Sequence, residues 1–136
     1  MSMSKTIHDT VVTALKTLPE IKQVYIGVVP SPAEVKRFPA IAIDFAVTRR
    51  KEGIVLGTME TEEEIDIYLY NTQRSNKYDD ILSDLVKLVD STLQFDSWLK
   101  DNCINNFIKD VYTDGGILHP RRVAKLTFYV RYIERK

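Results

Sequence analysis

The sequence has little cysteine, glycine or proline, no excess of either charge and no long apolar run, and each absence excludes a class of protein. The single cysteine, Cys103, cannot form an internal disulfide, which favours a reducing compartment such as the cytoplasm. Lysine and arginine total 19, as do aspartate and glutamate, so the chain lacks the positive charge that drives bulk binding to nucleic acid. No apolar run is long enough to span a membrane, and the N-terminus MSMSKTIHDT lacks the apolar centre of a signal peptide. Neither a transmembrane segment nor a signal peptide is therefore expected.

The remaining composition is that of an ordinary globular protein, with 44% hydrophobic and 28% charged residues. A chain of 136 residues has room for one hydrophobic core. Neither a linker nor a low-complexity tract interrupts it. Residues 1–136 are therefore expected to form a single domain.

Residues 6–18 show the apolar spacing of an amphipathic helix. Thr6 and Asp9 have the spacing of a capping box at its start, and Pro19 would end it. The expected buried face consists of Ile7, Val11, Ala14 or Leu15, and Leu18.

Residues 75–93 predict a second amphipathic helix, with Asp79 and Asp80 in the first turn, where the helix dipole favours acidic side chains. Residues 95–102 are expected to extend it, with Trp98 covering the core beneath. The apolar face consists of Ile81, Leu82, Leu85, Leu88, Val89 and Leu93.

Short alternating or β-branched runs predict strands. They occupy residues 24–29, 40–48, 63–71, 104–116 and 121–135, the last two being joined by a turn near Asp114, Gly115 and Gly116. In the strand over residues 40–48, one face carries Ile41, Ile43, Phe45 and Val47, and the other carries Ala42, Asp44, Ala46 and Thr48. The same alternation groups Ile65, Ile67 and Leu69 in one strand, and Ala124, Leu126, Phe128, Val130 and Tyr132 in another.

The elements therefore follow the order α-β-β-β-α-β-β. Helices separated by hairpins indicate an α+β fold, a mostly antiparallel sheet with two main helices packed on one face. The central hairpin is expected to project from it as an extended charged β-hairpin arm.

This arm has a basic side, an apolar tip and an acidic side. The residues concerned are Arg49, Arg50 and Lys51, then Ile54, Val55 and Leu56, then Glu60, Glu62, Glu63 and Glu64. In one interpretation the two sides form cross-strand pairs, each worth about 0.2–1 kcal/mol, but this leaves the apolar tip uncovered. In the other, the arm contacts a rotated copy of the chain, opposite charges meet and the tip is covered. We expect these ten residues to lie at a subunit interface.

Candidates for catalysis or metal binding are few. His8, in the first turn of the first helix, is expected to be exposed or capping, and His119 to face solvent or pack in its loop. A dyad of Cys103 and His119 is a catalytic alternative, but a lone cysteine is more often a small buried hydrophobe. The sequence has no HExxH motif, paired CxxC or calcium-loop spacing, and its Asp-Gly-Gly turn lacks the lysine of a phosphate-binding loop. We expect no enzymatic activity, cofactor or metal.

The order of segments resembles the tail terminator (tail completion or minor tail) proteins of long-tailed bacteriophages. An N-terminal amphipathic helix is followed by FPAIAIDFAVTRR, a charged hairpin, EIDIYLYN, DDILSDLVKLVDSTL and RRVAKLTFYVRYIER, so the resemblance covers nearly the whole chain. It implies a structural virion protein that forms a hexameric ring on the head-proximal end of the tail tube. Such a ring stops tube polymerisation and presents a surface for head-tail joining.

The partners implied are further copies of the chain, the tail tube protein and a head completion or connector protein, with DNA passing through the channel unbound and no membrane contact. The location implied is the head-proximal end of the virion tail, after assembly in the host cytoplasm. The acidic run from Glu60 to Glu64 could line the channel, where like charge repels DNA, or pair with cations of the next subunit. Two loops are expected to contact tube or connector, through Glu34, Lys36 and Arg37, and through His119, Arg121 and Arg122.

Two alternatives remain open. One is another component of the phage neck or tail with a related fold. The other is a monomeric nucleic-acid-binding module that reads bases on its sheet. Its candidate residues are Arg121, Arg122, Lys125 and Arg131 with Tyr68, Tyr70, Tyr129 and Tyr132.

Overall fold

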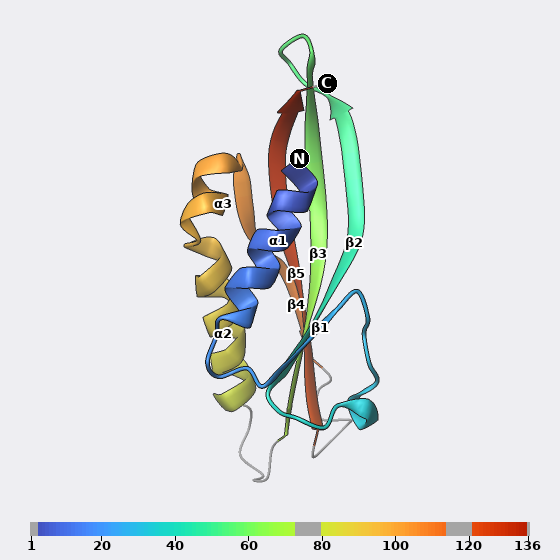
Figure 1. The fold of residues 1–136 in the computed structure, drawn as a ribbon, viewed down its shortest axis with the longest axis vertical. Coiled ribbons are helices and arrows are strands. Elements are labelled where there is room, and N and C mark those ends of the chain that lie inside the picture. Colours follow the sequence, from blue (N-terminus) through green and yellow to red (C-terminus); the bar gives the residue numbers. More distant parts are fainter. Residues whose placement is uncertain (1–2, 73–79, 114–120, 136) are drawn as a thin grey trace.

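The computed structural model describes residues 3–72, 80–113 and 121–135, which form a five-stranded sheet with the three α-helices on one face (Figure 1). The strands are β1 (Gln23–Ile26), β2 (Ala40–Glu52), β3 (Thr58–Thr72), β4 (Asn105–Thr113) and β5 (Arg121–Arg135). The helices are α1 (Met3–Lys16), α2 (Asp80–Gln94), α3 (Ser97–Asn102) and the short 3-10 helix η1 (Pro32–Glu34). In the sheet order β1-β2-β3-β5-β4, only β1 and β2 are parallel neighbours, which confirms the expected α+β class.

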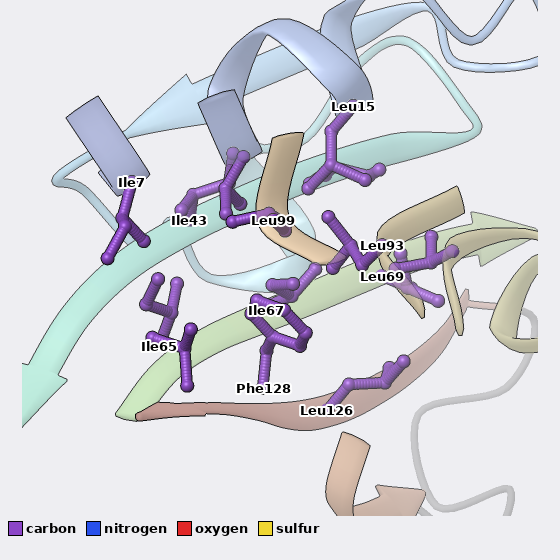
Figure 2. Packing of buried hydrophobic residues seen from close by; sticks show 14 of the residues in the cluster. Ile7, Leu15, Ile43, Ile65, Ile67, Leu69, Leu93, Leu99, Leu126 and Phe128 are labelled. Atoms are coloured by element: carbon purple, nitrogen blue, oxygen red, sulfur yellow. The ribbon is translucent and has the colours of Figure 1, made fainter. Parts of the chain in front are cut away.

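The main core lies between the three α-helices and one face of the sheet (Figure 2). Ile7, Val11 and Leu15 are fully buried on α1, as predicted from the helical spacing. The alternating set of β5 is also buried, and comprises Ala124, Leu126, Phe128, Val130 and Tyr132. Since each fully buried leucine, isoleucine or phenylalanine contributes about 1.5–3 kcal/mol, this layer holds the long strands beneath the helices.

The helix ends differ from the expected ones. Helix α1 begins at Met3, so Thr6 lies inside the helix and the proposed capping box is wrong. The Thr6 carbonyl accepts a bond from the Thr10 hydroxyl, and Asp9 pairs with Lys5 one turn away. The start of the second helix falls partly on residues 73–79, which lie outside the described residues.

Residues 97–102 form a separate helix, α3, instead of continuing α2. Asp96 caps α3, its carboxylate accepting a bond from the Leu99 backbone N–H at 3.0 Å. This cap redirects the chain, because an N-cap residue has extended backbone and cannot continue the preceding helix. Trp98 packs against the edge of the core, as expected.

A register shift between Phe45 and Val47 changes the predicted faces of β2. Ile41, Ile43 and Phe45 contact the core as expected, but Val47 is 36% exposed. One extra residue in a strand reverses the side-chain alternation beyond it. Thr48, expected on the opposite face, consequently points to the helix side, where its hydroxyl meets Glu63.

The other face of the sheet has a smaller apolar cluster, covered by the segment between β1 and β2. Val35, Ala40, Ala42 and Tyr70 are buried there. The Tyr70 hydroxyl donates to the Pro30 carbonyl at 2.8 Å, and burial raises the pKa of Tyr70 to about 12. The predicted loop after β1 is therefore packed on the sheet.

Candidate functional site

The arm is the upper part of the β2–β3 hairpin, residues 47–64, and ends in the loop at the top of Figure 1. Arg49 lies opposite Glu62 and Lys51 opposite Glu60 in the strand register. The arm is more than a two-stranded ribbon, because β5 accompanies β3 along its whole length, with Thr58 opposite Arg135. A third strand stiffens the arm, since isolated hairpins are only marginally stable in water.

Three apolar side chains project into solvent from the tip. Relative exposures are 102% for Ile54, 66% for Val55 and 100% for Leu56. Two glycines shape this loop. Gly57 has φ +81°, which residues with a Cβ rarely adopt, and a Cβ on Gly53 would collide with the Thr58 side chain. Backbone bonds from Gly53 to Thr58 and from Thr58 to Val55 close the tip. The loop is thus closed by its own hydrogen bonds, although no other part of the described chain covers the side chains of Ile54 and Leu56.

On the face away from the helices, the acids of β3 lie between cations of the adjoining strands. Glu60 is 3.8 Å from the Lys51 ammonium and 3.2 Å from Arg131 Nε. Glu64 lies 2.9 Å from both Arg49 and Lys109.

The first interpretation of the charged hairpin, pairing within the chain, therefore accounts for both of these acids. The hydrogen bond from Lys109 is the main reason that the pKa of Glu64 lies below its ordinary value. Each of these pairs has an exposed partner and is worth at most about 1 kcal/mol.

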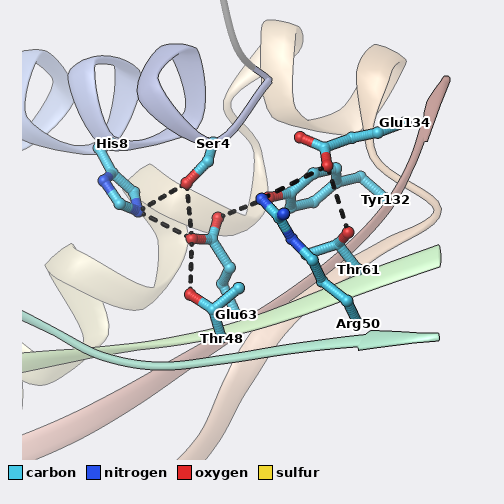
Figure 3. A network of polar contacts seen from close by, with 8 residues as sticks. All are labelled: Ser4, His8, Thr48, Arg50, Thr61, Glu63, Tyr132 and Glu134. Atoms are coloured by element: carbon cyan, nitrogen blue, oxygen red, sulfur yellow. Dashed lines mark hydrogen bonds and ion pairs between the residues drawn. The ribbon is translucent and has the colours of Figure 1, made fainter. Parts of the chain in front are cut away.

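Glu63 points the other way, into the helix side, and is 2% exposed (Figure 3). Its Oε1 accepts bonds from the hydroxyls of Ser4 at 2.8 Å and Thr48 at 3.2 Å, and lies 3.0 Å from His8 Nε2. Its Oε2 accepts a bond from the Tyr132 hydroxyl at 3.0 Å. The carboxylate therefore ties the first turns of α1 to the three strands that form the arm.

Burial alone would raise the pKa of Glu63, but the hydrogen bond and charge of His8 and the bonds from Ser4 and Tyr132 together lower it below the ordinary value. The charged carboxylate is thus the form that the site stabilises. His8 stacks on Phe45, with ring centroids 3.9 Å apart. His8 is a half-buried bridge between helix and sheet, so the expectation of an exposed or capping histidine is wrong.

Sequence reasoning missed this role of Glu63 by treating the acidic run as one surface. The alternation itself carries the signal, because Thr61, Glu63, Ile65 and Ile67 occupy every second position and share the buried face. Whether the arm residues contact another subunit remains a prediction. Glu63 is left out of the contact surface proposed below because its oxygens are already occupied inside the chain.

The first of the expected contact loops, around η1, lies at the end of the molecule opposite the tip (Figure 1). Glu34, Lys36 and Arg37 are exposed around η1, which touches β5. The Ser31 hydroxyl donates to Glu34 at 3.1 Å. His119, and with it the turn at residues 114–116, lies outside the described residues, as do the side chains of Arg121 and Arg122.

The cluster around Glu63 does not have the arrangement of a Ser-His-Asp triad. The Ser4 hydroxyl and the Glu63 carboxylate both meet His8 at Nε2, so the imidazole cannot relay a proton between a nucleophile on one nitrogen and an acid on the other. Burial raises the pKa of Cys103 to about 11, which keeps it an unreactive thiol at neutral pH. Among residues 3–72, 80–113 and 121–135, no group of three acidic, histidine or cysteine side chains could hold a metal. None of the described helices is long and apolar enough to cross a membrane.

The most unusual surface of this α+β fold is a stiff arm with an exposed apolar tip. Exposed apolar surface of this kind is typical of a protein that works by contacting other proteins. The family model described as Bacteriophage Tail Tube Terminator Protein matches residues 3–136. The chain belongs to this family, a structural component of the phage tail that interacts with the components of the tail tube. A comparison with curated proteins found no match.

Proposed function

We propose that the protein forms a closed ring, with six subunits as the expected number, on the head-proximal end of the tail tube. The ring stops tube polymerisation and offers its other side to the head completion or connector protein. Family membership supports a role at the tail tube. The observation that supports self-assembly is the exposed tip formed by Ile54, Val55 and Leu56. Assembly would take place in the host cytoplasm, and the finished ring stays in the virion tail.

The energy of the tip explains why a closed ring suits it better than a simple pair. Burying three aliphatic side chains contributes at most roughly 5–9 kcal/mol. Association of two proteins costs an estimated 4–15 kcal/mol in lost freedom. One tip is therefore marginal by itself. In a ring, each subunit uses the contact twice, once through its own arm and once through its neighbour's, so closure or a tube end as template stabilises the assembly.

The charges of the arm have a second role in this proposal. Glu60 and Glu64 are compensated by cations of their own chain, so the helix-free face has alternating charges instead of one acidic surface. Such a face does not attract DNA as a basic channel would, and DNA can pass without specific binding. Arg50 lies 3.8 Å from Glu134, and the partly buried Glu62 hydrogen-bonds Tyr129. We propose that the apolar tip provides the main contact to the neighbouring subunit, with Arg50, which is 55% exposed, and Glu62 beside it.

A nucleic-acid-binding module has less support. Lys125 lies 3.6 Å from Asp66, and Arg131 pairs with Glu60, so these cations are not free for phosphates. Tyr70 and Tyr132 are buried and cannot stack on bases. Another neck or tail component of related fold stays compatible with the same arm and sheet.

The test is tube growth in the presence of the protein. Purified tail tube protein would be polymerised with and without it, and tube lengths and ends measured by negative-stain electron microscopy. We expect shorter tubes with extra density at one end only, and a variant with Ile54 and Leu56 changed to serine should lose the effect. Unchanged tube lengths with no end density would contradict the proposal.

A further inference from the structure

A shallow groove of about 360 Å³ lies on the helix-free face, between the segment after β1 and the strands β3, β4 and β5. Val29, Pro30 and Pro32 line it from that segment, and Tyr68, Tyr112 and Lys125 line it from the strands. We call this site the tyrosine groove. Its volume falls at the lower end of the roughly 300–1,000 Å³ of small-molecule pockets.

The groove is built from parts that are fixed before anything binds. Tyr70 also lines it, and its hydroxyl bond to the Pro30 carbonyl ties the segment to the sheet. Two prolines restrict the backbone of that segment. Lys125 lies 5.8 Å from the centre of the Tyr68 ring and is paired with Asp66. A rigid apolar surface with a neutralised cation suits an aliphatic guest, which brings no charge of its own.

Such a guest is present on the same chain. The tip side chains of Ile54, Val55 and Leu56 are aliphatic and exposed, and backbone hydrogen bonds close the loop that carries them. Charge does not oppose their entry, because Lys51 beside the tip is compensated by Glu60 and Lys125 in the groove by Asp66. Tip and groove lie toward opposite ends of the molecule, so one copy cannot fill its own groove (Figure 1).

We propose that the tyrosine groove is the receptor for the arm tip of a second copy of this chain. This inference rests on the proposed ring, because it names the two surfaces that meet in it. Two different surfaces of one chain give a heterologous contact, the type that propagates around a ring. Neighbouring subunits would then be joined tip to groove, each using one tip and one groove.

Mixing two defective chains tests this directly. In the tip variant, Ile54→Ser and Leu56→Ser remove the guest, and in the groove variant Val29→Asp and Tyr112→Ser remove the receptor. These side chains are at least 40% exposed, so both variants should fold, which circular dichroism and thermal melting would check. The matched control is Phe95→Ser, a 69% exposed apolar side chain outside both surfaces.

Each defective chain alone should need at least tenfold more protein than wild type to assemble, by light scattering or by binding to tube ends. At high protein concentration their mixture should form a 1:1 heterodimer, because one intact tip and one intact groove remain, although a single contact binds more weakly than a closed ring. The Phe95→Ser chain should assemble like wild type. If the groove variant assembles like wild type while the tip variant fails, the tip docks elsewhere, on another copy or on the tube protein, and the inference is overturned.

Disulfide capture gives a second readout. A Leu56→Cys chain mixed with a Tyr112→Cys chain should form a crosslinked dimer on mild oxidation, whereas Leu56→Cys with Phe95→Cys should not. The native thiol interferes little, because burial raises the pKa of Cys103 to about 11. Rings without the expected crosslink would overturn the inference and leave the proposed function standing. Absence of assembly by the wild-type chain, both in solution and on tubes, would overturn both.

Discussion

Replacing Glu63 by alanine should destabilise the protein far more than any other change in the acidic run. The substitution removes the acceptor of bonds from Ser4, Thr48 and Tyr132 and the partner of His8. Tyr132 is fully buried, and leaving its hydroxyl unpaired costs about 1–3 kcal/mol. Loss of the remaining charge-assisted bonds adds to this destabilisation. Removal of the buried charge reduces it, because a buried carboxylate is costly to desolvate. We expect a net loss of about 2–4 kcal/mol in the free energy of unfolding.

The assay is urea or thermal unfolding followed by circular dichroism, with Glu62→Ala as the matched control on the opposite face of the same strand. At about 4 °C per kcal/mol for a chain of this size, Glu63→Ala should lower Tm by roughly 8–16 °C. Glu62→Ala should change Tm by less than about 4 °C, since Glu62 is only partly buried and substitutions outside buried networks seldom exceed about 0.5–1 kcal/mol. Equal effects of the two substitutions would refute the assignment of Glu63 as the link between helix and arm. Experiments that neutralise the acidic residues of the arm should therefore leave Glu63 unchanged, because its replacement would destabilise the fold.

Three further predictions concern the arm. The folded-state pKa of Glu63 lies below its ordinary value of 4.5, so the stability that its carboxylate contributes is complete above that pH and is lost as pH falls through the folded value. Unfolding measured as a function of acid pH should show wild type losing more stability than Glu63→Gln, and parallel curves for the two proteins would contradict this prediction. Gly57→Ala should cost roughly 1–2 kcal/mol, because alanine is strained at φ +81°, and an unchanged denaturation midpoint would show that the tip relaxes. Arg49→Ala should cost less than about 1 kcal/mol, since Lys109 still pairs with Glu64, and a larger loss in chemical denaturation would mean that the pairs act as a network.

The regular parts of this fold were predictable from periodicity, because burial on one face leaves a repeat in the sequence. Ile7, Val11 and Leu15 on α1 and the alternating apolar residues of β5 are the clearest cases. The element order and the α+β class follow from joining such segments.

The features that were missed depend on backbone details that the repeat does not encode. The register shift after Phe45 moves Thr48 to the helix side, and the amino acids at this point give no sequence signal of a bulge. The inward direction of Glu63 was present in the alternation, but its partners Ser4 and Tyr132 lie 59 and 69 residues away and became evident only in three dimensions. The tyrosine groove likewise combines residues of β3, β4 and β5 with the segment after β1.

Assembly into a closed ring through the arm can be measured by size exclusion with light scattering over a concentration series, combined with negative-stain images of the heaviest fraction. Measurements on the purified chain and on the chain bound to tail tubes would cover both untemplated and templated assembly. We expect a ring with a central hole and six subunits, in solution or at tube ends, which is lost when Ile54 and Leu56 are serine. A monomer at every concentration that also fails to bind tube ends would contradict it.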